Sequence, residues 1–418
     1  MPLPIEASKK FNEKPDARLR RAVDKLASDQ GVRQCVRHIH RNRQWTNEQH
    51  LQLCRVPAPT FFEEKRAEWM AAQFKGLGWD PRIDRAGNVV AYPDANREGP
   101  FVALTAHLDT VLSPRHLEDV RIGPGGRFHG PGVSDNGAGL AALLAIASCW
   151  KERPAAAENG HSLLLVANVG EEGEGNLSGM RFLCRSPLAS RIRSYLILDG
   201  PGTEHITCRA LASRRFEVVI QGPGGHSWSD HGNANPVHAI SRAIQFFTEA
   251  QFENGPSQTR LSYNFGIIEG GVSVNSIPSS ARAKLDLRSE DAACIESLAC
   301  ALSTAVERAI DVENERSAGG RVQGRIREIG ARPGGRLPDG ARILPYLHAV
   351  DAHLGIRAHV DCASTDANIP LSLGLEAVSI GAGGSGGGAH TPEEWFDPEG
   401  RELGLQRVLL TLCLLLSA

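Results

Sequence analysis

The stretch "FVALTAHLDTV" (Phe101–Val111) decides how the fold of this chain is interpreted. Its first half is a run of apolar residues after Gly99 and Pro100, which is typical of a strand buried inside a sheet. His107 and Asp109 end that run. Because side chains two residues apart point the same way on a strand, we expect both to lie on one face. A histidine beside a carboxylate is a common metal ligand, although a buried histidine next to a turn aspartate also fits the pattern.

The composition describes an ordinary globular protein with more than one domain. A chain of 418 residues is too long for a single core, and 41% hydrophobic and 22% charged residues are usual values. A formal net charge of -2 argues against a nucleic-acid or anionic-membrane partner. Nine cysteines without a CxxC pair, and an N-terminus without an apolar core, predict a cytoplasmic location. The apolar run "VLLTLCLLLSA" (408–418) is too short to span a bilayer and predicts a buried terminal helix.

Strand-like and helical segments alternate along most of the chain. Residues 16–76 are expected to be largely helical, with Pro57 and Pro59 as interruptions. The later strand-like runs are "NVVAYP", "FVALTAH", "SLLLVANV", "YLILD" and "LEAVSIGAG". Helical runs such as "GLAALLAIASCW" and "ARILPYLHAVDAHLG" lie between them. This alternation predicts an α/β fold, in which helices flank a mostly parallel sheet.

Residues 209–332 have a different pattern. Four longer alternating strands are expected there, in "RRFEVVIQG", "RLSYNFGIIEGG", "SARAKLDLRS" and "GRVQGRIREIG". Two helical stretches lie among them, near 235–250 and 290–310. We therefore expect an inserted α+β domain at 209–332 that separates the two parts of the first domain, 1–208 and 333–418. Residues 1–45 are expected to be a helical extension of that first domain.

Polar residues lie at the ends of several predicted strands of the parallel sheet. In such sheets ligand sites form at the carboxyl ends of the strands. "SLLLVANV" is followed by two glutamates, "YLILD" ends in an aspartate, and "LEAVSIGAG" leads through glycines to a histidine. A further aspartate stands before a predicted helix in "HGPGVSDNGAG". The candidate residues are His107, Asp135, Glu171, Glu172, Asp199 and His390.

Each candidate also has an ordinary structural explanation. Asp135 fits a helix N-cap, and Asp199 before a glycine fits a turn. The adjacent Glu171 and Glu172 fit a solvated surface, and His390 fits a loop. Because five such motifs occur at equivalent points of one sheet, we infer a metal site instead.

The candidate ligands are sufficient for two metal ions. Two histidines, two terminal carboxylates and one shared carboxylate make a dinuclear site with open positions for water. The assignment places His107 and Asp199 on one metal, Glu172 and His390 on the other, and Asp135 between them. Because neighbouring residues alternate in direction on a strand, Glu171 is left to take a proton from the bridging water. Nitrogen and oxygen ligands favour zinc, with cobalt or manganese also suitable.

These motifs together resemble one known family. "TAHLDTV", "GPGVSDNGAGLAALL", "GEEGEG", "LILDGPG", "GPGGHSW", "GGVSVNSIP", "LDLRS" and "AHTPEEW" are similar to motifs of the co-catalytic zinc metallopeptidases and amidohydrolases. That family includes peptidase T, glutamate carboxypeptidase, aminoacylase and succinyl-diaminopimelate desuccinylase. The resemblance spans about residues 50–418 and implies a zinc-exopeptidase-like catalytic domain with an inserted lid. It implies the same five metal ligands and Glu171 as general base. Asp109 is expected to be a catalytic residue because a carboxylate beside His107 fixes the tautomer of the imidazole. "SDNGAG" and "TPEEW" depart from the family's usual Asp-Lys-Gly and Asn-Glu forms.

The resemblance also implies roles for the inserted domain. His226 resembles a histidine that reaches a neighbouring subunit's site and stabilises the tetrahedral intermediate, which predicts a homodimer through the lid. Asn275 and Arg288 resemble residues that contact substrate, and an arginine fork suits a carboxylate. A turn histidine and a surface arginine are the structural alternatives for His226 and Arg288. Gly383 and Gly384 are expected to present backbone N–H groups to a substrate carboxylate.

The predicted activity is metal-dependent cleavage of amide bonds in small peptides, as in a di- or tripeptidase-like exopeptidase. In the resembled family, aspartate at the position of Asp199 is typical of peptide-cleaving members. An N-acyl amino acid amidohydrolase is the alternative. A homologue that only binds ligands is disfavoured, because all six metal and base positions are filled. Residues 383–387 spell the Gly-x-Ser-x-Gly pattern of serine hydrolases, but no helix is expected immediately after Ser385, which we place in a loop.

Overall fold

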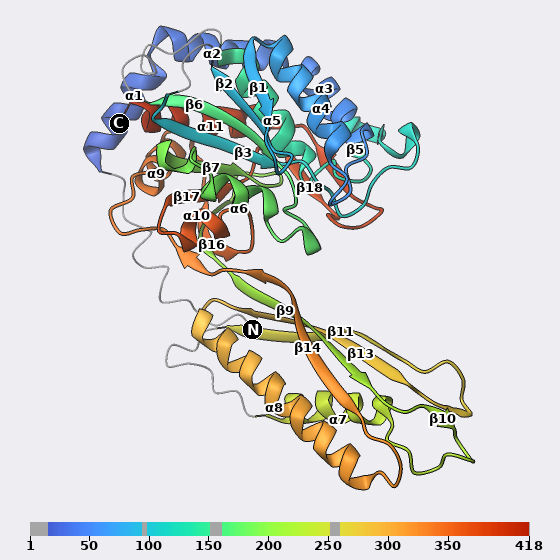
Figure 1. The fold of residues 1–418 in the computed structure, drawn as a ribbon. Helices are drawn as coiled ribbons and strands as arrows, with labels where there is room; N and C mark the ends of the chain where they lie inside the picture. Colours follow the sequence, from blue (N-terminus) through green and yellow to red (C-terminus); the bar gives the residue numbers. More distant parts are fainter. Residues whose placement is uncertain (1–15, 94–97, 151–160, 251–259, 418) are drawn as a thin grey trace. The chain divides into compact units, whose positions relative to one another are not determined.

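The computed structural model describes residues 16–93, 98–150, 161–250 and 260–417 (Figure 1). Contacts within the chain divide it into two compact units. The first comprises Met1–Ala210 with Gly335–Ala418, and the second comprises Leu211–Gly334. Each unit has hydrophobic core residues of its own.

The first unit is built around a large mixed sheet, and this confirms the predicted α/β fold class. At its centre β3 (Phe101–His107) lies between β6 (Ser162–Asn168) and β7 (Ile192–Leu198), parallel to both. Beyond β7, β17 (Glu376–Ile380) is also parallel. Antiparallel pairs complete both edges: β1 (Trp79–Ile83) with β2 (Val89–Pro93), and β8 (His205–Ala210) with β15 (Gly335–Arg336). A parallel strand, β16 (His359–Ala363), also pairs with β8.

Strand β3 shows why the central strands are continuous apolar runs. All seven of its residues are buried. Val102 and Leu104 belong to one core, whereas Phe101 and Ala103 belong to another. Because successive side chains point to opposite faces, a strand covered by helices on both sides needs apolar residues at every position.

Helices of the first unit also contribute buried residues to both of these cores. Those that contribute to the larger core are α1 (Ala17–Ala27), α2 (Gln30–Arg41), α3 (Arg43–Arg55), α4 (Glu64–Gly76), α5 (Gly137–Cys149), α9 (Ile343–Leu354) and α11 (Arg401–Leu416). Those that contribute to the smaller core are α6 (Ser178–Arg185) and α10 (Asn368–Ser372). The predicted helical character of residues 16–76 is confirmed, as is the buried terminal helix. Within the described residues, no helix combines the length and apolarity needed to cross a membrane.

A small second sheet in the first unit corrects one expectation. Its strands are β4 (Arg121–Ile122), β5 (Phe128–His129), β18 (Ser385–Gly387) and β19 (Trp395–Asp397). Ser385 therefore begins a short strand, paired with Asp397, and does not lie in a loop. A glycine-rich segment carries no strand signal of its own, and only its partner β19 makes it a strand. No helix begins directly after Ser385, since the next described helix, α11, begins at Arg401, so the turn of a serine hydrolase is absent from this described segment.

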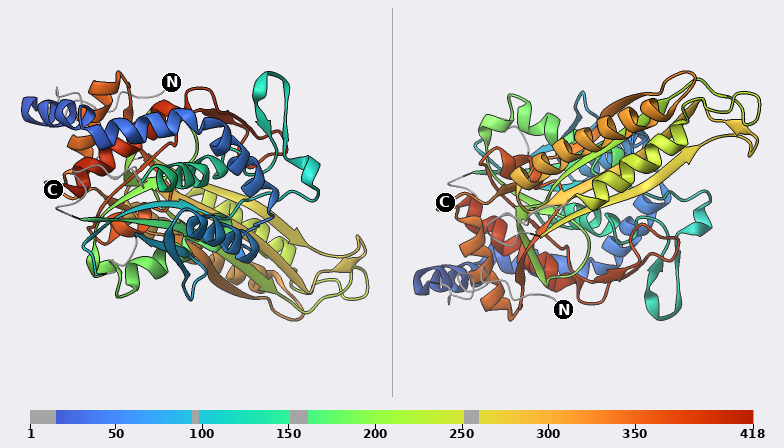
Figure 2. Two further views of the ribbon diagram at one scale, coloured as in Figure 1. Left: turned by 90° about the horizontal axis from the view of Figure 1, so that it is seen from above. Right: turned by 90° about the horizontal axis from the view of Figure 1, so that it is seen from below.

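The second unit is a four-stranded antiparallel sheet with two helices. The strands lie in the order β11 (Leu261–Gly270), β13 (Ser280–Ser289), β9 (Ala212–Gln221) and β14 (Gln323–Arg332). Figure 2 shows α7 (Pro236–Glu249) and α8 (Ala292–Arg316) beside each other over this sheet. Ala283, Leu285 and Leu287 of β13 join Phe247 of α7 in the core. A two-residue pair, β10 (Gly225–His226) with β12 (Ser276–Ile277), extends the unit. Helix α8 extends beyond the predicted 290–310.

The first unit contains a buried ion pair that we expect to be critical for stability. Arg407 of α11 is fully buried and donates from Nε and Nη2 to the carboxylate of Asp351 on α9, at 2.7 and 2.8 Å. We predict that Arg407→Met or Asp351→Leu alone lowers the free energy of unfolding by about 3–5 kcal/mol, because each leaves an unpaired buried charge. Urea unfolding measures this loss. The double variant should lose clearly less than the sum of the two single losses, and strict additivity would contradict the prediction.

Candidate metal centre

Five side chains from separate segments meet at the carboxyl edge of the large sheet. His107 is the last residue of β3, and Asp199 directly follows β7. Glu172 follows β6, His390 follows β18, and Asp135 precedes α5. Within the large sheet, the next strand along the chain after β3 is β6, which lies on one side of it, and the one after that, β7, lies on the other side. Such points, where the strand order reverses, are where α/β sheets form ligand sites.

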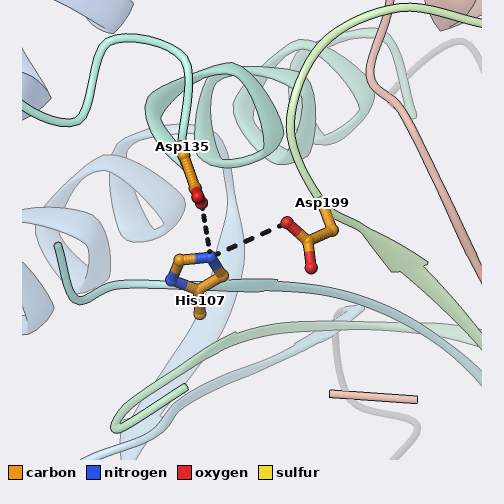
Figure 3. Close-up of side chains that lie close together, drawn as sticks. All are labelled: His107, Asp135 and Asp199. Atoms are coloured by element: carbon orange, nitrogen blue, oxygen red, sulfur yellow. Dashed lines mark hydrogen bonds and ion pairs between the residues drawn. The ribbon is translucent and has the colours of Figure 1, made fainter. Parts of the chain in front are cut away.

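One group consists of His107, Asp135 and Asp199 (Figure 3). Nε2 of His107 lies 3.0 Å from Oδ1 of Asp135 and 3.9 Å from Oδ1 of Asp199. Figure 3 shows both carboxylates directed at this one ring nitrogen. The imidazole is almost completely buried, so its position is well constrained.

A second group consists of Asp135, Glu172 and His390. Nε2 of His390 lies 3.1 Å from Oδ2 of Asp135 and 2.8 Å from Oε1 of Glu172. Asp135 therefore directs one oxygen to each histidine. His390 has a φ of +65°, a left-handed conformation that is uncommon for residues other than glycine. Strain of this kind is typical of residues whose position is needed by a site.

The donor set fits divalent cations. In each group, one imidazole nitrogen and two carboxylate oxygens lie within 4.8 Å of one another. These are the nitrogen and oxygen ligands that zinc, cobalt and manganese accept, and neither group contains a thiol. The residue that the two groups share is Asp135, whose two oxygens suit a ligand between two metal ions.

The electrostatics of the cluster indicate a need for positive charge. Burial and the neighbouring carboxylate of Asp135 raise the pKa of Asp199 to about 7. Hydrogen bonds to Asp135 and Glu172 raise the pKa of His390 to about 10. Burial acts to lower the pKa of His107, but hydrogen bonds to Asp109 and Asp135 outweigh it and keep that pKa well above its usual value. Crowded carboxylates favour nearby cations in this way.

Asp109 connects three loops of the site. Its side chain is fully buried, and its Oδ1 accepts a hydrogen bond from the backbone N–H of Glu171 at 2.9 Å. Its Oδ2 accepts from the backbone N–H of Glu172 at 2.9 Å and from the hydroxyl of Thr60 at 3.0 Å. Nδ1 of His107 contacts the backbone carbonyl oxygen of Asp109 at 3.0 Å and lies 3.5 Å from Oδ1 of its carboxylate. Acceptors at this nitrogen leave Nε2 free to bind a metal.

Strand alternation does not account for the different roles expected of Glu171 and Glu172. Strand β6 ends at Asn168, and Gly170 turns the chain with a φ of +66°, so strand alternation cannot separate the two side chains. Both residues are buried, which excludes the solvated surface as their explanation. A carboxylate oxygen of Glu171 lies within 4.8 Å of ligand atoms of His107 and Glu172, but Glu171 belongs to neither group that contains Asp135.

Asn136, rather than Asp135, is the N-cap of α5. Its Oδ1 accepts hydrogen bonds from the backbone N–H groups of Gly139 and Gly200, at 3.1 and 3.2 Å. Its Nδ2 donates to the carbonyl of Leu198 at 2.9 Å. The side chain of Asp135 therefore does not cap the helix, and its two oxygens contact His107 and His390 instead. Asn136 also ties the loop of Asp135 to the end of β7, where Asp199 stands.

Glu394 is a residue that the sequence analysis did not assign. Its buried carboxylate accepts hydrogen bonds from three backbone N–H groups, those of Gly132 at 2.8 Å, Ser134 at 2.7 Å and Asp135 at 2.9 Å. It therefore fixes the loop that carries Asp135. Glu394 lies in the motif "AHTPEEW", but no local pattern in the sequence shows that its carboxylate accepts from backbone groups about 260 residues away.

A second unassigned residue lies beyond β16. The carboxylate of Asp366 accepts a hydrogen bond from Nδ2 of Asn168, the last residue of β6, at 2.7 Å. Its charge is among the causes that raise the pKa of Asp199. Asp366 follows a strand that is only partly buried, so "HVDCA" lacks the apolar run that marked the other strands.

The predicted residues of the second unit do not all lie together. His226 pairs with Ser276 on β12, and the backbone N–H of Ser227 donates to the carbonyl of Asn275 at 3.0 Å, so His226 and Asn275 are neighbours. Arg288 lies near the other end of β13, where its Nε donates to Oδ2 of Asp286 at 2.7 Å. Nδ1 of His226 accepts the backbone N–H groups of Trp228 and Ser229, at 3.2 and 3.4 Å.

The glycine loop contradicts the expectation for one of its two residues, Gly383. The backbone N–H of Gly383 donates to the carbonyl of Gly202 at 3.0 Å, so it is not available to a substrate. A Cβ at Gly383 would lie 2.7 Å from the carbonyl oxygen of Arg401, and one at Gly384 would lie 2.6 Å from the ring of Phe396. These glycines are required because the chain passes close to the start of α11 and to β19.

The comparison with protein families identifies the class of protein. The model of the peptidase family M20/M25/M40 matches residues 103–413, so the chain belongs to this family and the predicted resemblance is confirmed. A probable carboxypeptidase of Aspergillus clavatus is 28% identical over 223 residues, which are 49% of this chain and 52% of that protein. A succinyl-diaminopimelate desuccinylase of Bradyrhizobium sp. is 25% identical over 223 residues, 50% of this chain and 57% of that protein. The chain thus spans about half the length of the curated relatives it matches.

A solved structure covers nearly the whole chain. A tripeptidase of Staphylococcus aureus aligns with a TM-score of 0.71 at 20% sequence identity. The alignment covers 90% of this chain and 99% of that one. At this identity the similarity establishes the fold alone, and it agrees with the predicted α/β class.

Glu394 provides a test of how the site is held. We predict that Glu394→Gln weakens zinc binding about 10- to 100-fold, because an amide group replaces one of the accepting oxygens and the loop of Asp135 loosens. Competition with a chelator of known affinity, followed by elemental analysis, measures this change. Glu393→Gln is the matched control, because Glu393 is the exposed neighbour. Equal zinc affinity in the two variants would contradict the role assigned to Glu394.

Proposed function

We propose that this chain is a metal-dependent hydrolase that cleaves amide bonds of small peptides, with two divalent metal ions, most readily zinc. The observation that carries the proposal is the position of Asp135, whose two oxygens face two histidines from different loops. His107 and Asp199 would hold one metal, and Glu172 and His390 the other. Membership of the peptidase family M20/M25/M40 supports the same reaction class.

The protein's own residues supply the rest of the chemistry. Bound divalent cations would polarise the amide carbonyl and make an attacking water more acidic. We assign to Glu171 the role of accepting the proton of that water, and the position of its carboxylate near ligand atoms of His107 and Glu172 supports this assignment. Asp109 orients the imidazole of His107 and, through two backbone N–H groups, the loop that carries Glu171. The buried setting strengthens each of these interactions.

Small peptides are the substrate class that we favour. The ligand after β7 is Asp199, which in the resembled family is typical of peptide-cleaving members. The structural similarity to a tripeptidase agrees with this choice. Hydrolysis of N-acyl amino acids is the second candidate, because a succinyl-diaminopimelate desuccinylase is among the curated relatives.

The second unit would act as a lid and as a dimerisation domain. Since Nδ1 of His226 accepts two backbone N–H groups, the neutral ring carries its proton on Nε2 and can donate it to a substrate oxygen. Within the described residues β11 is an edge strand with exposed Ile267 and Ile268. Such an edge favours pairing with a second copy of the same chain.

A substrate screen tests the proposed reaction. The metal-free protein is incubated with zinc, cobalt or manganese and then with di- and tripeptides and N-acyl amino acids. We expect turnover only with metal, and a higher kcat/KM for the best peptide than for the best N-acyl amino acid. Glu171→Gln should still bind about two metal ions per chain but lose at least 10²- to 10⁴-fold in kcat, because the proton acceptor is gone.

Two results would overturn parts of this proposal. Wild-type turnover by a metal-loaded Glu171→Gln protein would remove Glu171 from its role. A tenfold higher kcat/KM for an N-acyl amino acid than for every peptide would replace the peptidase by an amidohydrolase.

The role of His226 is tested by mixing two inactive variants. If His226 acts in the partner's site, His226→Ala and Glu171→Gln chains should complement each other, because the mixed dimer contains one complete site. Equal mixing should restore up to about a quarter of the wild-type activity, since half of the dimers are mixed. Native mass spectrometry confirms the exchange of subunits. Absence of activity in confirmed mixed dimers would mean that His226 does not act across the dimer.

A further inference from the structure

Two aromatic side chains are exposed next to the loops of the metal centre. Phe61 and Phe62, in the connection between α3 and α4, are 63% and 73% exposed. Exposed apolar side chains that form a contiguous patch, rather than standing singly, mark binding surfaces. The sequence from Ala58 to Phe62, "APTFF", contains no charged residue.

The backbone holds this pair in an unfavourable conformation. Phe61 has a φ of +76°, which is a clear outlier for a bulky residue. Its N–H donates to Oε1 of Glu63 at 3.0 Å, and the N–H of Phe62 donates to the carbonyl of Pro59 at 2.8 Å. Strain that is kept in place by surrounding hydrogen bonds is typical of binding and catalytic segments.

The turn that carries Phe61 and Phe62 is hydrogen-bonded to two loops of the metal centre, the one after β3 and the one after β6. The hydroxyl of Thr60 donates to the carboxylate of Asp109, which also accepts the backbone N–H of Glu171. Oε1 of Glu63 accepts the N–H of Gly170, next to Glu171. Pro59 forms a parallel bridge with Thr110, so the half-exposed Val111 is a close neighbour of the turn. We call Phe61, Phe62 and Val111 the apolar rim.

We propose that the apolar rim binds the apolar side chain of the substrate residue beside the scissile amide. The inference rests on the proposed function, and it sets the substrate class as peptides or acylated amino acids with large apolar side chains. We favour the substrate as the molecule that binds there. The carboxylate of Asp109 accepts hydrogen bonds both from Thr60 in the turn and from the backbone of the proton acceptor Glu171, so the rim is tied to the reaction site. Removal of apolar surface from water supplies the preference.

Binding and turnover are measured separately to test the proposal. Dipeptides X-Gly and Gly-X and the compounds N-acetyl-X carry glycine, alanine, leucine or phenylalanine at X. Calorimetry with metal-loaded Glu171→Gln protein gives the Kd of each, and the otherwise unchanged metal-loaded protein gives kcat/KM. We expect the leucine compound to exceed its glycine counterpart about tenfold or more in both quantities. With Phe62→Ala this ratio should fall to about threefold or less, while the glycine compound changes less than about twofold.

A matched control separates the rim from exposed apolar residues in general. Leu373 is 55% exposed and precedes the amino end of β17, at the edge of the sheet opposite the metal centre. Leu373→Ala should leave the leucine-to-glycine ratio unchanged. Phe62→Leu, which retains apolar surface, should preserve most of the ratio.

Each other outcome has a definite meaning. The proposal is overturned if Phe62→Ala leaves the leucine-to-glycine ratio unchanged, or if it weakens binding and turnover of the leucine and glycine compounds equally. The turn would then have only a structural role. A change in the mass of the assembly with an unchanged ratio also overturns it, and would make the rim a contact between copies of the chain. A preserved binding ratio without turnover of any compound would refute the proposed hydrolase while the rim stands.

Discussion

The site depends on one buried carboxylate, that of Asp109. A charge removed from water is tolerated only if its surroundings supply donors, and the cost of leaving it unpaired is several kcal/mol. Here the donors to the carboxylate are two backbone N–H groups of the loop after β6 and the hydroxyl of Thr60, two segments distant in sequence, and the imidazole of the neighbouring His107 lies 3.5 Å away. If either segment moved away, the buried charge would lose part of its hydrogen bonding. Asp109 therefore makes the positions of His107 and Glu171 mutually dependent.

A second carboxylate performs the same task on the other side of the site. Glu394 accepts hydrogen bonds from three backbone N–H groups of the loop that carries Asp135. Asn136 donates a hydrogen bond from the same loop to the last residue of β7. The ligand side chains consequently stand on loops whose backbone is fixed at several points. Sites of this kind are positioned before any ligand arrives, because the supporting hydrogen bonds belong to the fold.

The sequence predicted the parts that depend on local patterns. Apolar runs covered on both faces marked the central strands, and the polar residues at their ends indicated the side chains that the fold brings together. Contacts between distant backbone groups leave no such pattern: the bond from Asp135 to Glu394 joins positions 259 residues apart. The use of Gly383 inside the fold, and the pairing of Ser385 in a strand, likewise depend on neighbours that only the folded chain supplies.

The join between the two units has an evolutionary consequence. Ala210 and Gly335 flank the inserted residues, and they are antiparallel partners on β8 and β15 within the first unit. To the host sheet, the whole insertion is therefore equivalent to the loop of a β-hairpin. Loop length has little effect on the strands that a hairpin joins, because the entropy of closure grows only slowly with length. Recombination at this point could exchange one insertion for another of any size while the register of the host strands, and the ligands at their ends, stayed the same.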